Sequence, residues 1–314
     1  MVKSLLDNFY DADIITQSGG CVVRLARYLL TLKAGDRVIP ISEMAKKYKM
    51  GVGTIQNSLQ KLADANAVKL LSRGHMGTFV ESIDKNILWK YCLYGYVRGT
   101  MPIPYSNVLV GLATGIYDTF QSDEIMLSMG YVRGSRVRVQ NLQAGLSDFT
   151  ICSDFAAQKA IEEDPGLKIA LKFKDDTYMG KPAFLFREGV GLHDGIKMGI
   201  DDSSYDQEIL TKLACRGVSV KFVKARYNNL FMMLRDKKID GTVWSTLDLD
   251  GRNFTGNIVP IEGHEDEISA AGRAVMLISG NNMEKMTFVK ELFDPERIYR
   301  IQQDVISGKA LPNY

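Results

Sequence analysis

The sequence predicts an α/β protein in which a small helical unit closed by a β-hairpin precedes a larger domain of alternating strands and helices. Its 314 residues, 46% hydrophobic and 24% charged, are enough for two independent cores. Residues 1–82 show short helical patterns followed by one hairpin, whereas the chain from about residue 106 alternates apolar strands with amphipathic helices. That alternation is typical of mostly parallel sheets.

Charge placement bears on the partner of the protein, and cysteine usage bears on its compartment. The net charge is only +2, but residues 1–85 hold twelve Lys and Arg against eight Asp and Glu, which is +4 and leaves −2 for the rest. The four cysteines are widely spaced without a C-x-x-C pair, so neither a zinc site nor a disulfide framework is indicated. Neither an apolar run long enough to span a bilayer nor a signal-like start is found. We therefore expect a cytoplasmic protein without membrane contact.

The N-terminal unit has the pattern of a winged helix-turn-helix. Gly20–Leu32 carries an apolar helical stripe and ends at Lys33-Ala34-Gly35-Asp36. ISEMAKKYK predicts a short helix starting at Ser42, and TIQNSLQKLADANA a third helix after a glycine-bearing turn. The two strands predicted around Arg73–Gly77 form a wing. We assign residues 1–85 to this domain and expect double-stranded DNA as its partner.

These residues resemble the GntR-type winged-helix family over Gly35–Val80, including Thr54-Ile55 at the start of the third helix and Gly77-Thr78-Phe79-Val80 in the wing. Three family arginines are replaced here, by Ser42, by Gly51-Val52 and by Gln56. Arginine makes strong phosphate and guanine contacts, so an operator different from the family's is expected. The remaining candidates for DNA contact are Lys46, Lys47, Lys49, Thr54, Gln56, Asn57, Lys61, Arg73 and His75.

Two alternatives remain open for this domain. The winged helix could serve only as a protein-interaction or dimerisation module. His75 at the wing tip could reach the minor groove or a phosphate, or be a solvent-exposed turn residue.

Residues 86–105 form the predicted connector. Its aromatic residues and its two prolines, Pro102 and Pro104, favour a packed segment over a flexible tether. Either core packing or a domain-coupling and dimer-forming role fits. A homodimer is expected because one winged helix reads few base pairs and because the N-terminus carries surplus apolar residues: Leu5, Leu6, Phe9, Tyr10, Ile14 and Ile15.

The larger domain, residues 106–314, has the element order of two α/β lobes. Strands are predicted at Val108–Gly111, in SRVRVQ, at Phe149–Cys152, and in later segments such as IKMGIDD and DGTVWS. Two such lobes resemble the periplasmic-binding-protein-like fold of type two, through the helix, glycine, aspartate, strand pattern of Leu142–Ile151 and its repeat at Leu234–Val243. Together with the N-terminal unit, the chain resembles the YhfZ family of regulators, which implies this architecture and no settled effector.

In open α/β sheets, ligands bind beyond the carboxyl ends of the strands. A small-molecule effector is therefore expected between the lobes, and its binding is expected to close them. Serine and backbone N–H groups at helix starts favour an anion, although Asp201 and Asp202 leave a cationic or neutral ligand open. The candidate effector-binding residues are Thr114, Gly115, Ser153, Asp154, Ser203, Ser204, Trp244 and Ser245.

No catalytic, cofactor or metal motif is recognised. The Gly189-Val190-Gly191 run lacks the context of a dinucleotide site, and neither a Walker motif nor a G-x-S-x-G elbow occurs. The histidines lack metal-ligand spacing, and the acidic residues around His264 predict a solvated loop rather than a cation site. We expect a non-enzymatic regulator without cofactor. The alternative is a solute-binding or small-substrate enzyme domain whose winged helix serves assembly only.

Overall fold

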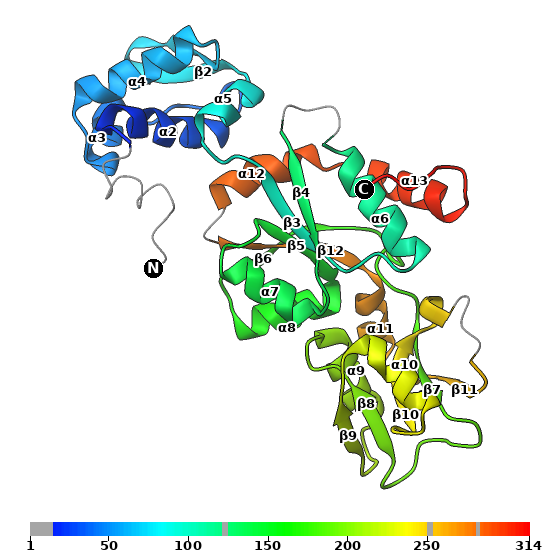
Figure 1. Cartoon of the computed structure of the whole chain (residues 1–314). Coiled ribbons are helices and arrows are strands. Elements are labelled where there is room, and N and C mark those ends of the chain that lie inside the picture. Colours follow the sequence, from blue (N-terminus) through cyan, green and yellow to red (C-terminus); the bar gives the residue numbers. More distant parts are fainter. Residues whose placement is uncertain (1–14, 121–124, 250–253, 281–282) are drawn as a thin grey trace. The chain divides into compact units, whose positions relative to one another are not determined.

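The computed structural model describes residues 15–120, 125–249, 254–280 and 283–314. The chain divides into two compact units (Figure 1), which we describe separately. The first unit comprises Met1–Val97, Asp123–Met126 and Glu284–Glu291, and the second comprises Arg98–Ser122, Leu127–Met283 and Leu292–Tyr314. Of the apolar N-terminal residues singled out above, Leu5, Leu6, Phe9, Tyr10 and Ile14 lie outside the described residues.

The first unit contains the predicted winged helix-turn-helix. Leu25 and Leu29 of the first helix pack with Ile55 and Leu62 of the third, all fully buried. The second helix begins at Ile41 rather than at Ser42, because its first turn closes on the Pro40 carbonyl. The elements are α2 (Gln17–Leu30), α3 (Ile41–Tyr48), α4 (Val52–Asp64), β1 (Val68–Ser72), β2 (Thr78–Ile83) and α5 (Lys85–Tyr91).

One helix of the first unit comes from far along the chain. Helix α12 (Met283–Leu292) packs on the end of α5, where the Phe288 and Trp89 rings lie 5.8 Å apart at 56°. Lys285 is buried and donates to the Tyr96 carbonyl at 3.1 Å. Glu291 bonds Lys85 at 2.5 Å and lies 3.5 Å from Lys33. The first unit is therefore discontinuous in sequence.

We expect Glu291→Ala to lower the free energy of unfolding of the first unit by about 0.5–1 kcal/mol, the range of partly exposed ion pairs. Partial burial raises the pKa of Glu291, but Lys85 and Lys33 outweigh it and the net shift is downward. The contribution should therefore be complete above the ordinary glutamate pKa and disappear as the pH falls through the lowered value. Thermal unfolding of both proteins at pH 7 and at acid pH measures this difference. The exposed Glu284 on the same helix supplies the control, Glu284→Ala, and an equal effect of both changes would contradict the prediction.

The second unit consists of two lobes, each built on one five-stranded sheet (Figure 1). In the first lobe the strand order is β4-β3-β5-β12-β6, with β3 parallel to β5 and with β12 antiparallel to β5 and β6. Helices α7 and α8 pack against this sheet. The elements are β3 (Val97–Met101), α6 (Asn107–Asp118), β4 (Leu127–Tyr131), α7 (Ser135–Gln143), β5 (Phe149–Ser153), α8 (Asp154–Glu163), β6 (Leu167–Lys172), β12 (Ala274–Ser279) and α13 (Pro295–Ile306).

The second lobe has the strand order β11-β7-β10-β8-β9. Strands β8, β9 and β10 run parallel, and β7 is antiparallel to β10 and β11. The chain returns to the first lobe through α11. The elements are β7 (Pro182–Phe186), β8 (Lys197–Ile200), α9 (Tyr205–Ala214), β9 (Lys221–Lys224), α10 (Tyr227–Arg235), β10 (Gly241–Ser245), β11 (Asn257–Pro260) and α11 (Glu265–Gly272).

Two predicted strands of the first lobe are wrong. Val108–Gly111 lies in α6, which is apolar on most sides because it is buried against α13. A Cβ on Gly111 or Gly115 would come within 2.9 Å of α13 backbone atoms, so these glycines permit close helix packing. A helix buried all round lacks the amphipathic period and cannot be told from a strand by its apolar run.

The segment SRVRVQ lies in helix α7, and its alternation of polar and apolar residues was misleading. Arg138 is 2% exposed and donates to the Val132 carbonyl and the Tyr178 hydroxyl, both at 2.8 Å. Arg138, a polar residue in the alternating pattern, therefore faces the interior and not the solvent. The first strand of this sheet is β3, within the predicted connector of residues 86–105, which also contains most of α5.

Candidate functional sites

The candidate DNA-contacting residues of the first unit lie on α3, on the turn after it, on α4 and on the wing. The side chains of Lys46, Lys47, Lys49, Gln56, Asn57, Lys61, Arg73 and His75 are exposed, and Thr54 is half-buried. Helix α4 begins at exposed residues, with Gly51 at its N-cap and no capping side chain. Its first backbone N–H groups are therefore accessible to a phosphate.

Sequence reasoning missed one cation beside the wing, Arg37. Its backbone forms an isolated bridge with Phe79, and a Cβ on Gly77 would lie 2.9 Å from the Arg37 Nε. Gly77 also has a positive φ of 98°, so this turn requires glycine for two reasons. The guanidinium of Arg73 lies 4.9 Å from the Phe79 ring. Two arginines thus flank the same hairpin.

The second unit contains a cavity of about 580 Å³ between its two lobes. It lies at the carboxyl ends of β3, β4, β8, β9 and β10, since residues that follow the first four strands and the last residues of β10 line it. Helices α6, α7, α9 and α10 all begin at its wall. Their positive dipole ends favour negative charge in the cavity.

Four predicted effector-binding residues line this cavity: Ser203, Ser204, Trp244 and Ser245. The Ser204 hydroxyl caps α9 by accepting from the Gln207 N–H. The Ser245 side chain is 2% exposed, and among the described residues its Oγ has no hydrogen-bond partner. The indole of Trp244 stacks on the Tyr227 ring at 3.9 Å and 8°.

The other four predicted residues do not line the cavity. Thr114 and Gly115 lie inside α6, where the Thr114 hydroxyl donates to the Val110 carbonyl and Gly115 faces Ile298 of α13. Ser153 is fully buried, caps α8 and bonds Asp206. Asp154 bonds Lys172 at 2.9 Å and Arg273 at 3.1 Å. We do not propose an effector role for these four residues.

The carboxylates of Asp201 and Asp202 at the cavity are paired with a lysine or with hydrogen-bond donors of the protein. Asp202 forms an ion pair with Lys224 at 2.8 Å, which lowers the pKa of that carboxyl. Asp201 accepts from the Ser203 N–H and hydroxyl and from the Tyr227 N–H, at 2.6–3.0 Å. Burial raises the pKa of Asp206, at the cavity base. The repulsion expected from Asp201 and Asp202 is thus reduced.

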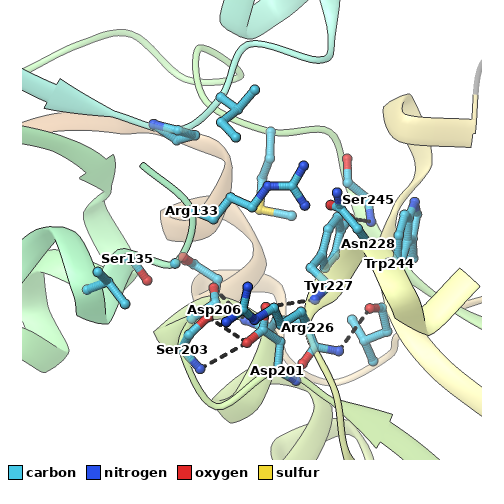
Figure 2. A pocket seen from close by; sticks show the side chains of 18 of the residues that line it. Arg133, Ser135, Asp201, Ser203, Asp206, Arg226, Tyr227, Asn228, Trp244 and Ser245 are labelled. Atoms are coloured by element: carbon cyan, nitrogen blue, oxygen red, sulfur yellow. Dashed lines mark hydrogen bonds between the residues drawn. The ribbon is translucent and has the colours of Figure 1, made fainter. Parts of the chain in front are cut away.

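Of the three arginines that line the cavity, Arg138 is buried and bonded within the first lobe, and sequence reasoning also missed the other two, Arg133 after β4 and Arg226 before α10. Both side chains are exposed, and neither has a hydrogen-bond or ion-pair partner within the described parts of the chain. Figure 2 shows Arg133 extending toward the wall formed by Tyr227, Asn228 and Trp244. Arg133 follows β4, a strand that the sequence analysis did not predict. Had β4 been predicted, the rule that ligands bind beyond the carboxyl ends of strands would have indicated Arg133.

A metal site is not indicated in the described ranges, where no cluster of three or more His, Cys, Asp or Glu could hold an ion. The residues after His264 do not form the predicted loop. Glu265, Asp266 and Glu267 are the first turn of α11, where acidic side chains complement the helix dipole. Within the same ranges, no helix is both long and apolar enough for a membrane span.

A winged helix-turn-helix joined to a two-lobed α/β domain defines the class of DNA-binding regulators with a binding-protein-like domain. Residues 33–80 match a model described as a helix-turn-helix domain. Residues 84–314 match the model of the YhfZ C-terminal domain, and the chain belongs to that family.

Two proteins named YhfZ and one periplasmic binding protein are similar to this chain. The uncharacterized protein YhfZ of Escherichia coli (strain K12) is 27% identical over 300 residues, covering 96% of this chain and 98% of that protein. The crystal structure of YhfZ from Shigella flexneri is 25% identical, with a TM-score of 0.63 over 73% of this chain and 97% of that one. The periplasmic aliphatic sulphonate binding protein SsuA of Escherichia coli is 12% identical, with a TM-score of 0.51 over 68% of this chain and 75% of its own, and shares the fold.

Proposed function

We propose that this protein is a transcriptional regulator whose binding to a double-stranded DNA operator is controlled by a small anion bound between the two lobes. The helix-turn-helix unit is the evidence for DNA as the partner. The protein would then act in the cytoplasm, where the DNA is. We also propose a homodimer, because paired half-sites supply the specificity that one winged helix lacks. A GntR-like mode of DNA reading belongs to the same proposal.

The observation that carries the effector proposal is the pairing pattern of charges in the cavity. Asp201 and Asp202 are engaged with groups of the protein, whereas Arg133 and Arg226 have no such partner in the described chain. Guanidinium groups bind carboxylate and phosphate through paired hydrogen bonds. Ser203, Ser204 and Ser245 would add hydroxyl groups, and the starts of α9 and α10 would add dipoles.

We expect Arg133→Gln and Arg226→Gln each to lower the affinity for the effector anion about tenfold or more, because a charged hydrogen bond contributes about 1.5–3 kcal/mol. A thermal-shift screen with carboxylates, phosphates, sulphonates and quaternary amines identifies the anion, and titration of the variants measures its affinity. Arg216→Gln, at an exposed arginine of the second lobe outside the cavity, should leave the affinity unchanged.

Two outcomes would contradict the proposal. Stabilisation by cationic compounds alone would exclude an anionic effector. Anion affinity that is unaffected by both cavity variants would place the anion elsewhere. An anion that binds the cavity without changing any DNA complex would favour the alternative, a solute-binding or small-substrate enzyme domain that uses its winged helix for assembly.

A further inference from the structure

Two tyrosines face each other across the cavity, one from each lobe. Tyr105 follows β3 of the first lobe and Tyr227 begins α10 of the second. Their ring centroids are 6.4 Å apart and the rings are 25° from parallel. Aromatic atoms in contact lie about 3.5 Å apart, so a flat ring between them needs about 7 Å. An outward movement of one tyrosine that brings the two ring planes about 7 Å apart would admit such a ring.

The two sides of this slot differ in their exposure to solvent. Tyr227 is fixed: its N–H donates to Asp201 at 2.8 Å, its hydroxyl accepts from the Ser245 N–H at 3.3 Å, and its ring rests on Trp244. Figure 2 shows Tyr227 and Trp244 side by side at the cavity wall. Tyr105 is 51% exposed. Tyr105 is therefore the more exposed side of the slot, and we assign to it the movement that admits a ring.

Polar groups suited to one end of a ligand lie around the same slot. Arg133 extends toward Tyr227 from the first lobe (Figure 2), and Arg226 directly precedes it in the chain. The buried Ser245 Oγ, which lacks a partner among the described residues, lines the same cavity. Rings on two sides with arginines beside them suit a ligand that is flat at one end and anionic at the other.

We propose, as a refinement that rests on the proposed effector site, that the effector is an aromatic or heteroaromatic anion. Its ring lies between Tyr105 and Tyr227, and its anionic group contacts Arg133 and Arg226. Stacking on both faces selects a flat ring over a puckered one of similar size, because a flat ring contacts both tyrosine rings over its whole face.

The test compares anions that are matched in charge and carbon skeleton but differ in flatness: benzoate with cyclohexanecarboxylate, phenyl phosphate with cyclohexyl phosphate, and benzenesulphonate with cyclohexanesulphonate. Calorimetric titration of the full chain should show about tenfold tighter binding of the flat member of at least one pair. Tyr105→Leu should remove this preference, while Tyr117→Leu, at an exposed tyrosine of α6 outside the cavity, should retain it.

The ring is located by fluorescence. The chain has two tryptophans, so Trp89→Phe leaves Trp244 as the reporter. The preferred ring compound should change the Trp244 emission, and the affinity from this titration should equal the calorimetric one. Equal binding of flat and puckered anions, or a preference that survives Tyr105→Leu, would refute the ring proposal and leave the anion site intact. Failure of every anion to bind would refute both proposals. Binding of benzyltrimethylammonium but not of benzoate would refute the anion and indicate a cationic ligand held by the aromatic rings.

Discussion

Replacing Tyr205 with alanine is expected to lower the free energy of unfolding of the two-lobed domain by about 3–5 kcal/mol, the cost of removing a large buried side chain. Tyr205 begins α9 of the second lobe, yet it is 2% exposed within a core cluster that includes Val139, Leu142 and Val275 of the first lobe. Its ring also lies 3.9 Å from the Arg136 guanidinium. Alanine would leave a cavity where the lobes meet.

Polar bonds surround this contact. The Tyr205 N–H donates to Ser135 Oγ at 2.9 Å, and its hydroxyl donates to Glu163 at 2.5 Å. Arg136 donates to Glu208 of α9 at 3.2 Å. The start of α9 therefore joins the lobes on one side of the cavity. If effector binding closes the lobes further, the movement should pivot about this contact.

Urea unfolding followed by circular dichroism measures the effect, with Tyr205→Phe as the matched control. Phenylalanine keeps the ring and loses one hydrogen bond to the Glu163 carboxylate, which contributes about 1.5–3 kcal/mol. A loss of similar size in the alanine and phenylalanine variants would contradict the anchoring role of the ring. Separate unfolding transitions of the two lobes in the alanine variant would support it further.

The elements that sequence reasoning predicted well are those with local signals. The helices of the first unit follow a 3.6-residue apolar period, and the wing turn carries Gly74 and Gly77, both with positive φ. The cavity residues Ser203, Ser204, Trp244 and Ser245 follow from one topological rule, because they lie in the loop after β8 or end β10.

The errors arise from contacts between distant segments. Thr114 was placed at the site because α6 was interpreted as a strand, and only the packing of α13 explains the apolar run. Helix α12 joins the first unit from residues nearly two hundred positions away from Tyr96, a pairing without any local pattern. Arg133 and Arg226 lie in loops, where an isolated charge has no periodicity to mark it.

The DNA complex is expected to weaken steeply with salt. Six of the exposed cations of this unit are candidates for phosphate contact: Arg37 before α3, Lys46 and Lys47 on α3, Lys49 after it, Lys61 on α4 and Arg73 at the wing. Each phosphate contact contributes about −0.9 to the slope of log affinity against log salt. If all six cations of one winged helix bind phosphate, affinity should fall about 10³-fold between 50 and 200 mM salt. A homodimer with both winged helices bound should show a steeper loss.

Fluorescence anisotropy with a duplex from the promoter of the protein's own operon, and with a scrambled duplex, separates phosphate contacts from base reading. Lys46→Ala and Lys61→Ala should weaken both duplexes similarly and reduce the slope by about one each. Gln56→Ala or Asn57→Ala should instead change the preference between the duplexes by about 1–3 kcal/mol, the discrimination of one good base contact. Lys168→Ala, at an exposed lysine of β6 in the second unit, serves as the control and should change neither quantity. Affinity that is independent of salt, or a Lys61→Ala slope equal to that of the control, would remove these residues from the DNA interface.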